Sequence, residues 1–379
     1  MTNILIGGDV CPIGRNRQLF QLGQADAILN NLLIEFEEAD YSVVNLECPL
    51  IERKSPIEKD GRTLGEPVEC VNGLKAAGID AVNLANNHIL DHGETGLRST
   101  LAACANAGIK CFGAGANRSK ASRILFCDIN GRRIGFLGIA EHEFSIAGEY
   151  SWGANPLDII ETVRLLKRTK NEHDFLVTLV HGGREHYPYP SPRLQQVCRF
   201  LVEEGAGAVI CQHSHCAGCY EYYQKAPIVY GQGNFIFDPL HIRKTTWNEG
   251  FLVQLILNDS NECHAEWIPF AQSLDRPGVR RMPPKETQAF VAGLEARSRE
   301  ISVDGAVQRK WLEYCRREKY AYASRIRGHN RLLRVINRKL HFSDWLYSKT
   351  TKLMQRNVVE CEIHREALET LWHDMETDF

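Results

Sequence analysis

The stretch AVNLANNHILDHG, residues 81–93, joins an apolar, strand-like run directly to a cluster of polar side chains. The cluster contains Asn86, Asn87, His88, Asp91 and His92. Polar groups at the end of a buried strand need partners, because burying them unpaired is costly. Asn in such a turn is usually a capping or left-handed residue. An amide oxygen also binds metals, however, and an imidazole can contact a substrate, so the stretch predicts a polar site.

Four other apolar runs end in the same way. Asp9 follows NILIGG, Glu47 ends SVVNLE, His181 ends FLVTLVH, and His213 and His215 occur two apart in AVICQHSHC. Taken singly, such residues are usually caps, ion-paired carboxylates or structural histidines. Open α/β sheets place their sites at the carboxyl ends of strands, so five such runs together predict one shared site. In an extended segment both imidazoles of HSH would point the same way.

The order of the predicted elements indicates an α/β fold. Up to about residue 268, β-rich runs alternate with helical patterns, which is typical of βα units around a sheet. The predicted strands cover 4–7, 42–46, 81–84, 134–139, 175–180 and 208–211, and the predicted helices cover 18–38, 94–107, 156–170 and 192–204. Strands at 228–230, 251–257 and 264–268 follow without long helices, which predicts an antiparallel closing section.

A domain boundary is expected in SLDRPGVRRMPP, residues 273–284, which holds three prolines and a glycine. We therefore predict a main domain at 1–272 and a helical, basic C-terminal domain at 273–379, with helices at 286–299, 306–340 and 358–375. Residues 305–356 contain 14 Lys or Arg against three acidic residues. The basic helix at 325–340 suits contact with a membrane surface or a polymer-synthesis complex, and packing against the main domain is the alternative.

The composition excludes several classes of protein. Nowhere do about 18 apolar residues follow one another, and the start MTNILIGGDV resembles no signal peptide, so we expect a soluble, cytoplasmic protein. Thirteen scattered cysteines are typical of reduced thiols, and the pair Cys216 and Cys219 is interpreted as structural. A P-loop, a G-x-S-x-G motif, a dinucleotide fingerprint and a nucleic-acid motif are all missing, so no nucleic-acid partner is expected.

The motifs GGDVCPIGR, NLE, ANNHILDHG, HGGRE, HSH and YGQGNFIFD occur in this order between about residues 3 and 240. The series resembles the bacterial capsule synthesis protein CapA family, also called poly-γ-glutamate synthesis proteins, within the calcineurin-like metallophosphatase superfamily. The resemblance implies a four-layer α/β/β/α metallophosphatase-like sandwich, to which this chain adds a C-terminal α-helical extension.

The resemblance also implies a ligand set for two metal ions. Asp9 and His215 would bind one ion, Glu47 would bridge, and Asn87, His181 and His213 would bind the second. His88 would act as general acid or transition-state stabiliser, so the implied catalytic residues are His88, Asp9 and Glu47. Residues from the same motifs would orient the phosphate or the ligands: Arg15, Asn86, Asp91, Arg184, Glu185 and Asn234.

Three positions depart from the pattern of the superfamily. The superfamily often has Asp-x-His in this segment, and Cys11 occupies the position of that histidine, two residues after Asp9. The first metal therefore has one expected ligand fewer. Glu47 replaces a usual Asp, and its longer side chain could alter the metal spacing. Ser214 replaces the proline of His-Pro-His, which changes the turn more than the ligation.

Oxygen and imidazole donors suit Mn, Fe or Zn, so the expected cofactors are two divalent metal ions. Such a pair can acidify a bridging water and hold a phosphoryl group, which predicts a phosphoesterase with hydroxide as nucleophile. The resemblance places the expected substrate, a phosphorylated small molecule or polymer intermediate, in bacterial capsule or surface polymer biosynthesis. Two alternatives stay open: a non-catalytic assembly or scaffold factor, and a metal-dependent amide hydrolase or transferase acting on a glutamyl substrate.

Overall fold

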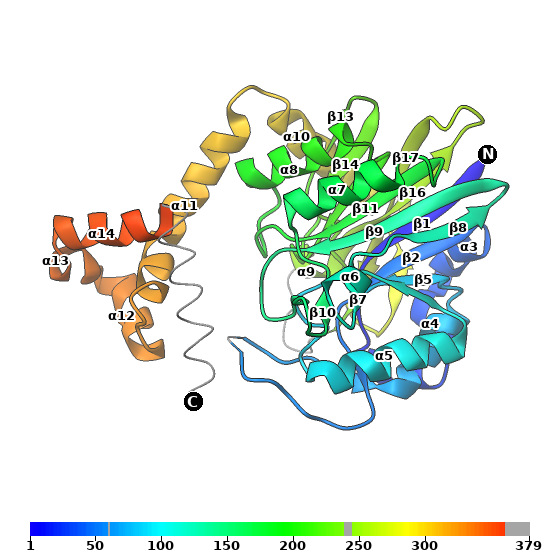
Figure 1. Cartoon of the computed structure of the whole chain (residues 1–379), viewed down its shortest axis with the longest axis horizontal. Coiled ribbons are helices and arrows are strands. Elements are labelled where there is room, and N and C mark those ends of the chain that lie inside the picture. The colour runs from blue at the N-terminus through cyan, green and yellow to red at the C-terminus, as the bar shows by residue number, and fades with distance from the viewer. Residues whose placement is uncertain (60, 239–244, 361–379) are drawn as a thin grey trace. The chain divides into compact units, whose positions relative to one another are not determined.

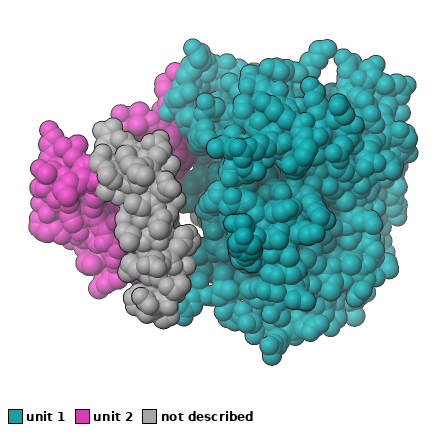
Figure 2. All heavy atoms as spheres, viewed as in Figure 1, with its two compact units in different colours: residues 1–308 teal, residues 309–379 magenta. Residues whose placement is uncertain are grey.

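The computed structural model describes residues 1–59, 61–238 and 245–360. The chain divides into two compact units, Met1–Gln308 and Arg309–Phe379 (Figure 2). Unit 1 contains two large sheets, and the described part of unit 2 is helical (Figure 1). Each unit is described separately below.

The first sheet of unit 1 has the order β18-β17-β16-β1-β2-β5-β6, and β15 pairs with the end of β1. Strands β1, β2, β5 and β6 run parallel, whereas β16, β17 and β18 are antiparallel. The antiparallel closing section is thus confirmed for 251–257 and 264–268. The strand bounds are β1 (Thr2–Cys11), β2 (Tyr41–Leu46), β5 (Ala81–Asn83), β6 (Lys110–Phe112), β15 (Asn234–Phe237), β16 (Glu249–Leu257), β17 (Cys263–Gln272) and β18 (Val279–Arg281).

The second sheet has the order β13-β14-β12-β11-β9-β8, with parallel pairing from β9 to β14 and antiparallel strands at both edges. The predicted strand at 228–230 belongs here, parallel to β12, and is not part of the antiparallel section. The bounds are β8 (Leu125–Ile129), β9 (Arg132–Ala140), β11 (Phe175–His181), β12 (Ala208–Gln212), β13 (Tyr220–Tyr223) and β14 (Ala226–Tyr230). Two short pairs, β3 (Leu50–Ile51) with β4 (Glu66–Pro67) and β7 (Ala114–Gly115) with β10 (Gly153–Ala154), lie outside both sheets.

Successive side chains of a strand point to opposite faces of its sheet, and both faces of each sheet pack against other layers of unit 1. Ile4 and Ile6 of β1 pack in one core with Phe136 and Val177 of the second sheet, whereas Leu5 faces a second core. Helices α1 (Asn16–Gln21), α4 (Val71–Ala76) and α5 (Gly93–Ala107) cover that second core. Helices α7 (Ile159–Thr169) and α8 (Pro192–Glu203) cover the outer face of the second sheet. The predicted four-layer α/β/β/α sandwich is confirmed.

The predicted helix at 18–38 was wrong as a single element. The region contains α1, α2 (Ala25–Leu29), the 3-10 turn η1 (Asn30–Leu32) and α3 (Leu33–Glu37). Gly23 and Asn30 have φ angles of 65° and 49°, which a right-handed helix cannot contain, so the chain turns at both. The remaining short elements of unit 1 are η2 (Val68–Cys70), α6 (Arg118–Ala121) and α9 (Thr245–Asn248).

The first unit extends beyond the boundary that we expected at 272. Strand β18 lies inside the proline-rich segment, and α10 (Pro284–Ile301) packs on unit 1 through buried Leu294 and Ile301. The compact unit therefore ends at Gln308.

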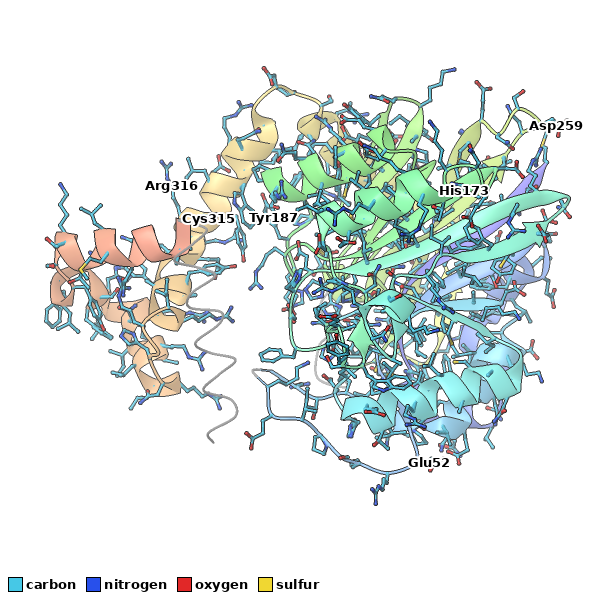
Figure 3. All side chains as sticks on the ribbon, in the orientation of Figure 1. Glu52, His173, Tyr187, Asp259, Cys315 and Arg316 are labelled. Atoms are coloured by element: carbon cyan, nitrogen blue, oxygen red, sulfur yellow. The ribbon has the colours of Figure 1, made fainter. Side chains whose placement is uncertain are left out.

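Unit 2 consists of helices in its described part. Helix α11 (Ala306–Arg325) starts in unit 1 and carries Cys315 and Arg316 (Figure 3); α12 (Arg331–Leu340), α13 (Ser343–Leu346) and α14 (Lys349–Glu360) follow. The predicted helix at 306–340 is broken, because Asn330 caps a new helix by accepting a hydrogen bond from the Leu333 amide. Most of the predicted helix at 358–375 lies outside the described residues. None of the helices described combines the length and apolar character that crossing a bilayer requires.

Gly138→Ala tests how closely the two sheets approach. A Cβ atom at Gly138 of β9 would lie 2.1 Å from the Asn83 amide oxygen of the other sheet, so either the buried Asn83 side chain or the sheets must move. We expect the free energy of unfolding to fall by about 1–3 kcal/mol in urea denaturation. The control Gly293→Ala in α10, whose Cβ would lie 3.4 Å from an Arg297 nitrogen, should be neutral or slightly stabilising. Equal stabilities of the two variants would contradict the proposed close approach.

Candidate metal centre

The predicted site residues come together where strand ends of the two sheets meet. Asp9 lies in β1 and Glu47 directly follows β2, both in the first sheet. His181 ends β11, and His213 and His215 follow β12, all in the second sheet. These five side chains, and Asn87 after β5, are all buried. The site therefore depends on the packing of one sheet against the other.

Two groups of potential metal ligands share one carboxylate. Glu47, His181 and His213 form one group, and Asp9, Glu47 and His215 form the other, with the ligand atoms of each within 4.8 Å of one another. The Glu47 Oε1 atom lies 3.6 Å from His181 Nε2 and 3.8 Å from His215 Nε2. The Asn87 Oδ1 atom lies 3.0 Å from His181 Nε2, so the amide oxygen joins the first group. The structure thus brings the residues expected to bind metal together in these two groups.

Glu47 is the least satisfied residue of the site. Both of its carboxylate oxygens are buried, and neither accepts a hydrogen bond from any residue that the structure describes. Burial, and then the nearby Asp9 charge, raise the pKa of Glu47 well above its ordinary value. An ionised carboxylate in such surroundings is costly unless a cation compensates it. The oxygen and imidazole donors around Glu47 fit divalent ions such as Mn²⁺, Fe²⁺ or Zn²⁺.

Hydrogen bonds orient the ligands of the second group. The Asn234 Oδ1 atom lies 2.9 Å from His215 Nδ1 and accepts a hydrogen bond from it. The other ring nitrogen of His215, Nε2, is directed at Glu47. The Asn45 amide donates to Asp9 Oδ1 at 2.8 Å, and the His213 backbone N–H donates to Asp9 Oδ2 at 3.2 Å. Asp9 therefore keeps a fixed orientation, although burial raises its pKa.

The backbone of the HSH segment differs from our expectation. His213 and His215 have φ angles of 96° and 53°, so the segment is a turn and is not extended. Residues other than glycine rarely adopt this left-handed backbone conformation, and residues strained in this way cluster at functional sites. The two imidazoles thus reach different neighbours: His213 Nδ1 lies 3.1 Å from His181 Nε2, whereas His215 faces Asp9 and Glu47.

The three histidines are held in the neutral form. Burial is the largest cause that lowers the pKa of His181, of His213 and of His215, and the last falls to about 4. A neutral imidazole offers a lone pair to a metal, whereas a protonated one does not. The site is therefore prepared to bind cations at neutral pH.

His88 belongs to a buried polar cluster beside the ligands. Its Nδ1 atom lies 2.6 Å from Asp91 Oδ2, and Nε2 has no hydrogen-bond partner among the described residues. Lys59 Nζ donates to Asp91 Oδ1 at 2.7 Å and to the Asn87 carbonyl at 3.2 Å. The Lys59 side chain is only 3% exposed. Asp91 therefore links His88 to a buried cation.

Sequence reasoning missed three residues of the site. Lys59 lies in the irregular segment between β3 and β4, and no motif marks it. Glu143 accepts a hydrogen bond at 3.0 Å from Asn87 Nδ2 and so orients its amide oxygen. Asn45 lies within the NLE motif itself, but the sequence predicts only a strand at this position. Its position two residues before Glu47, on a strand registered with Asp9, was the available signal.

The predicted supporting residues have different surroundings. Asn86 donates to the Leu46 carbonyl and to Asn45, so it holds the loop against β2. Glu185 is partly buried, which opposes ionisation, but His213, His215 and Arg184 lower its pKa overall. Arg184 and Glu185 thus lie close to the ligands.

Arg15 is engaged away from the ligand groups. It donates to Asp238 Oδ2 at 2.6 Å and to the Ser273 carbonyl at 2.7 Å. It therefore connects the loop after β1 to the segments that follow β15 and β17.

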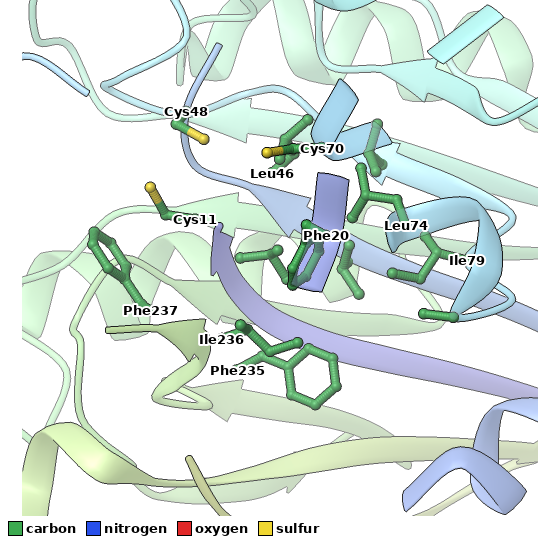
Figure 4. Close-up of a cluster of buried hydrophobic side chains, with 14 of the residues drawn as sticks. Cys11, Phe20, Leu46, Cys48, Cys70, Leu74, Ile79, Phe235, Ile236 and Phe237 are labelled. Atoms are coloured by element: carbon green, nitrogen blue, oxygen red, sulfur yellow. The ribbon is translucent and has the colours of Figure 1, made fainter. Parts of the chain in front are cut away.

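Cys11 does not replace the missing ligand. Its thiol lies beside that of Cys48, and the two sulfur atoms face one another in the core (Figure 4). Burial raises the pKa of Cys11, so the neutral thiol persists. Cys216 and Cys219 are likewise buried thiols, and burial raises the pKa of Cys216 to about 11. The group containing Asp9 therefore has fewer ligands than the group containing His181.

Residues 3–239 match the protein family described as bacterial capsule synthesis protein PGA_cap. The chain is 28% identical to the capsule biosynthesis protein CapA of Bacillus anthracis, over 74% of this chain and 72% of that protein. It is 30% identical to the PGA biosynthesis protein CapA of Bacillus subtilis, over 56% of this chain and 57% of that protein. Among solved structures, a putative 5'-nucleotidase from Staphylococcus aureus in complex with alpha-ketoglutarate is similar with a TM-score of 0.43 and 12% identity, over 78% of this chain and 58% of that one.

Glu47→Gln tests the cost of the unpaired carboxylate. Without metal at pH 8, the variant should unfold with a free energy about 1–3 kcal/mol higher than wild type, because wild-type Glu47 must either bury a charge or take up a proton on folding. The difference should shrink as pH falls toward the ordinary Glu pKa, because the pKa of folded Glu47 is raised and the unfolded chain there takes up the proton as well. Urea denaturation in EDTA measures both values. Exposed Glu52→Gln is the control, and a destabilised Glu47→Gln at every pH would contradict the interpretation.

A double-mutant cycle tests the link between Lys59 and Asp91. Lys59→Met, Asp91→Asn and the double variant should show a coupling free energy above about 1 kcal/mol, because this ion pair is buried. The same cycle on exposed Glu94 and Arg98 should give at most about 0.5 kcal/mol. Urea denaturation supplies all the values. Equal couplings would show that Lys59 does not stabilise the His88 cluster.

Proposed function

Because the chain belongs to the family of bacterial capsule synthesis proteins PGA_cap, we propose that unit 1 is a metal-dependent phosphoesterase of bacterial capsule or surface polymer biosynthesis. The observation that supports this proposal most strongly is the buried carboxylate of Glu47, shared by two groups of ligands and without a hydrogen-bond donor among the described residues. A purely structural carboxylate would be expected to have such donors.

Two divalent cations would occupy the proposed centre. Asn87, His181 and His213 would hold one, Asp9 and His215 would hold the other, and Glu47 would contact both. Bound Mn²⁺, Fe²⁺ or Zn²⁺ ions would supply Lewis acidity, which polarises a phosphoryl group and acidifies water. The ion held by Asp9 and His215 would be the more weakly bound, since Cys11 contributes no ligand.

The chain's own residues would position the substrate and move a proton. In the proposal, the His88 imidazole donates a proton from Nε2 to the leaving oxygen, while Asp91 accepts its Nδ1–H and fixes the ring. Lys59 holds Asp91 and the Asn87 carbonyl in place. Arg184, beside Glu185 and His213, carries a charge complementary to a phosphate.

The substrate class is proposed from the chemistry of the site and from the relatives. The printed names of the relatives refer to capsule or PGA biosynthesis, and the divalent ions that the oxygen and imidazole donors would hold can bind phosphate, so a phosphorylated small molecule or polymer intermediate is proposed. We also propose that the reaction takes place in the cytoplasm, and the free thiols of the described cysteines, which are typical of a reducing compartment, support this proposal.

The experiment combines metal analysis with a turnover assay. The purified chain should bind divalent metal and, with Mn²⁺ added, hydrolyse generic phosphomonoester or phosphodiester substrates. His88→Ala should keep the metal but lower kcat by about 10²- to 10⁴-fold. His213→Ala should lose metal, while exposed His264→Ala should change neither.

Three results would count against the proposal. A chain without metal and without turnover would exclude the enzyme and leave an assembly factor. Bound metal with cleavage of a glutamyl amide, but of no phosphate ester, would replace it with an amide hydrolase. Unchanged metal content in His213→Ala would refute the ligand assignment.

A further inference from the structure

Exposed hydrophobic side chains are concentrated in unit 2. Of the 21 large hydrophobic residues that are exposed in the described chain, 12 lie between Leu312 and Val359. That segment is much shorter than unit 1, which has the other nine. Scattered exposed residues are normal on a soluble protein, but such a concentration marks an interaction surface.

Helix α12 packs on its neighbour through a polar residue and exposes several of its apolar residues. Its buried residue is Asn337, which donates to Ser324 Oγ at 2.8 Å on α11 and accepts from the Ser343 amide at 2.9 Å. Leu332 and Leu340, in contrast, are 68% and 70% exposed. An amphipathic helix normally buries its apolar face against its neighbour. Here α12 is attached through a polar residue, while Leu332, Val335 and Leu340 face solvent and Ile336 is half-buried.

The same helix carries positive charge. Arg331, Arg338 and Lys339 are exposed, and α12 has no acidic residue. Nearby acidic charge is already compensated, since Asp344 accepts from Lys319 at 3.2 Å and from Tyr320 at 2.7 Å. Within the part of the chain that the structure describes, Arg331, Arg338 and Lys339 form no ion pair of their own.

We propose that α12 docks unit 2 on an anionic lipid bilayer. The α12 surface is defined by Leu332, Val335, Leu340, Arg331, Arg338 and Lys339. The aliphatic side chains would enter the boundary between headgroups and acyl chains, and the Arg and Lys side chains would extend to lipid phosphates. The proposal does not depend on the metal centre.

Both kinds of residue together favour a lipid surface over other partners. A soluble polyanion would neutralise the three cations but would leave the aliphatic side chains in water. An apolar protein surface would cover the aliphatic side chains but would leave the cations unpaired at its edge. An anionic bilayer satisfies both, and each basic residue near its surface strengthens binding about fivefold.

Vesicle co-sedimentation of the full chain tests the proposal. Phosphatidylcholine vesicles containing phosphatidylglycerol should bind the chain, and pure phosphatidylcholine vesicles should bind it at least about tenfold more weakly. Arg338→Glu with Lys339→Glu should lower binding by about tenfold or more. Leu332→Gln with Leu340→Gln should cause a similar loss, because the apolar contribution is removed.

Matched variants in unit 1 are the controls. Lys75→Glu with Lys170→Glu changes the same charge at exposed positions, and Leu22→Gln with Ile160→Gln replaces exposed apolar side chains. Both should bind vesicles as wild type does. Circular dichroism melting of all variants, compared with wild type, detects misfolding, and any variant that melts early is replaced by Val335→Gln or Arg331→Gln.

Other outcomes would overturn the proposal. Equal binding to vesicles with and without phosphatidylglycerol would remove the role of charge. Binding to soluble polyphosphate that the leucine variants leave intact, without binding to vesicles, would identify a polyanion site instead. Loss of vesicle binding in the unit 1 controls would place the lipid contact elsewhere.

Discussion

The burial of Glu47 between two sheets is the constraint on which the rest of unit 1 depends. Its carboxylate is removed from water, and so are the polar side chains around it. Each of these side chains therefore needs a hydrogen bond or a bound cation as a partner. Asn45 is such a partner for two buried residues: its amide nitrogen donates a hydrogen bond to Asp9, and its amide oxygen accepts one from Asn86. The second sheet brings His181 to within 3.6 Å of Glu47, which requires the close packing that Gly138 allows opposite Asn83.

Most strands could be predicted from sequence because their periodicity is local. A continuous apolar run such as FLVTLVH reports burial on both faces, and the structure places it in the middle of a parallel sheet. The helix at 18–38 could not be predicted correctly, because apolar spacing continued through Gly23 and Asn30 while the backbone turned at both. The end of unit 1 was missed because the packing of α10 is a long-range property.

The candidate ligands were predictable for a different reason. Parallel strands bring their carboxyl ends to one edge, so residues far apart in sequence could be grouped by their position after a strand. Lys59 and Glu143 could not be found in this way, since they lie on irregular segments whose course depends on tertiary contacts. The φ angles of His213 and His215 were equally unpredictable, because a two-residue spacing alone suggested an extended chain.

If the proposed metal centre is correct, the unpaired carboxylate of Glu47 also couples the lifetime of the protein to its supply of metal. A fold that carries an uncompensated charge is less stable without its ligand, and binding of the ligand raises the folded fraction by mass action. Cellular proteases remove unfolded chains continuously, so small differences in stability change abundance several-fold. With the proposed metal bound in wild type, a cell short of that metal would accordingly hold less of this protein, without any dedicated sensor.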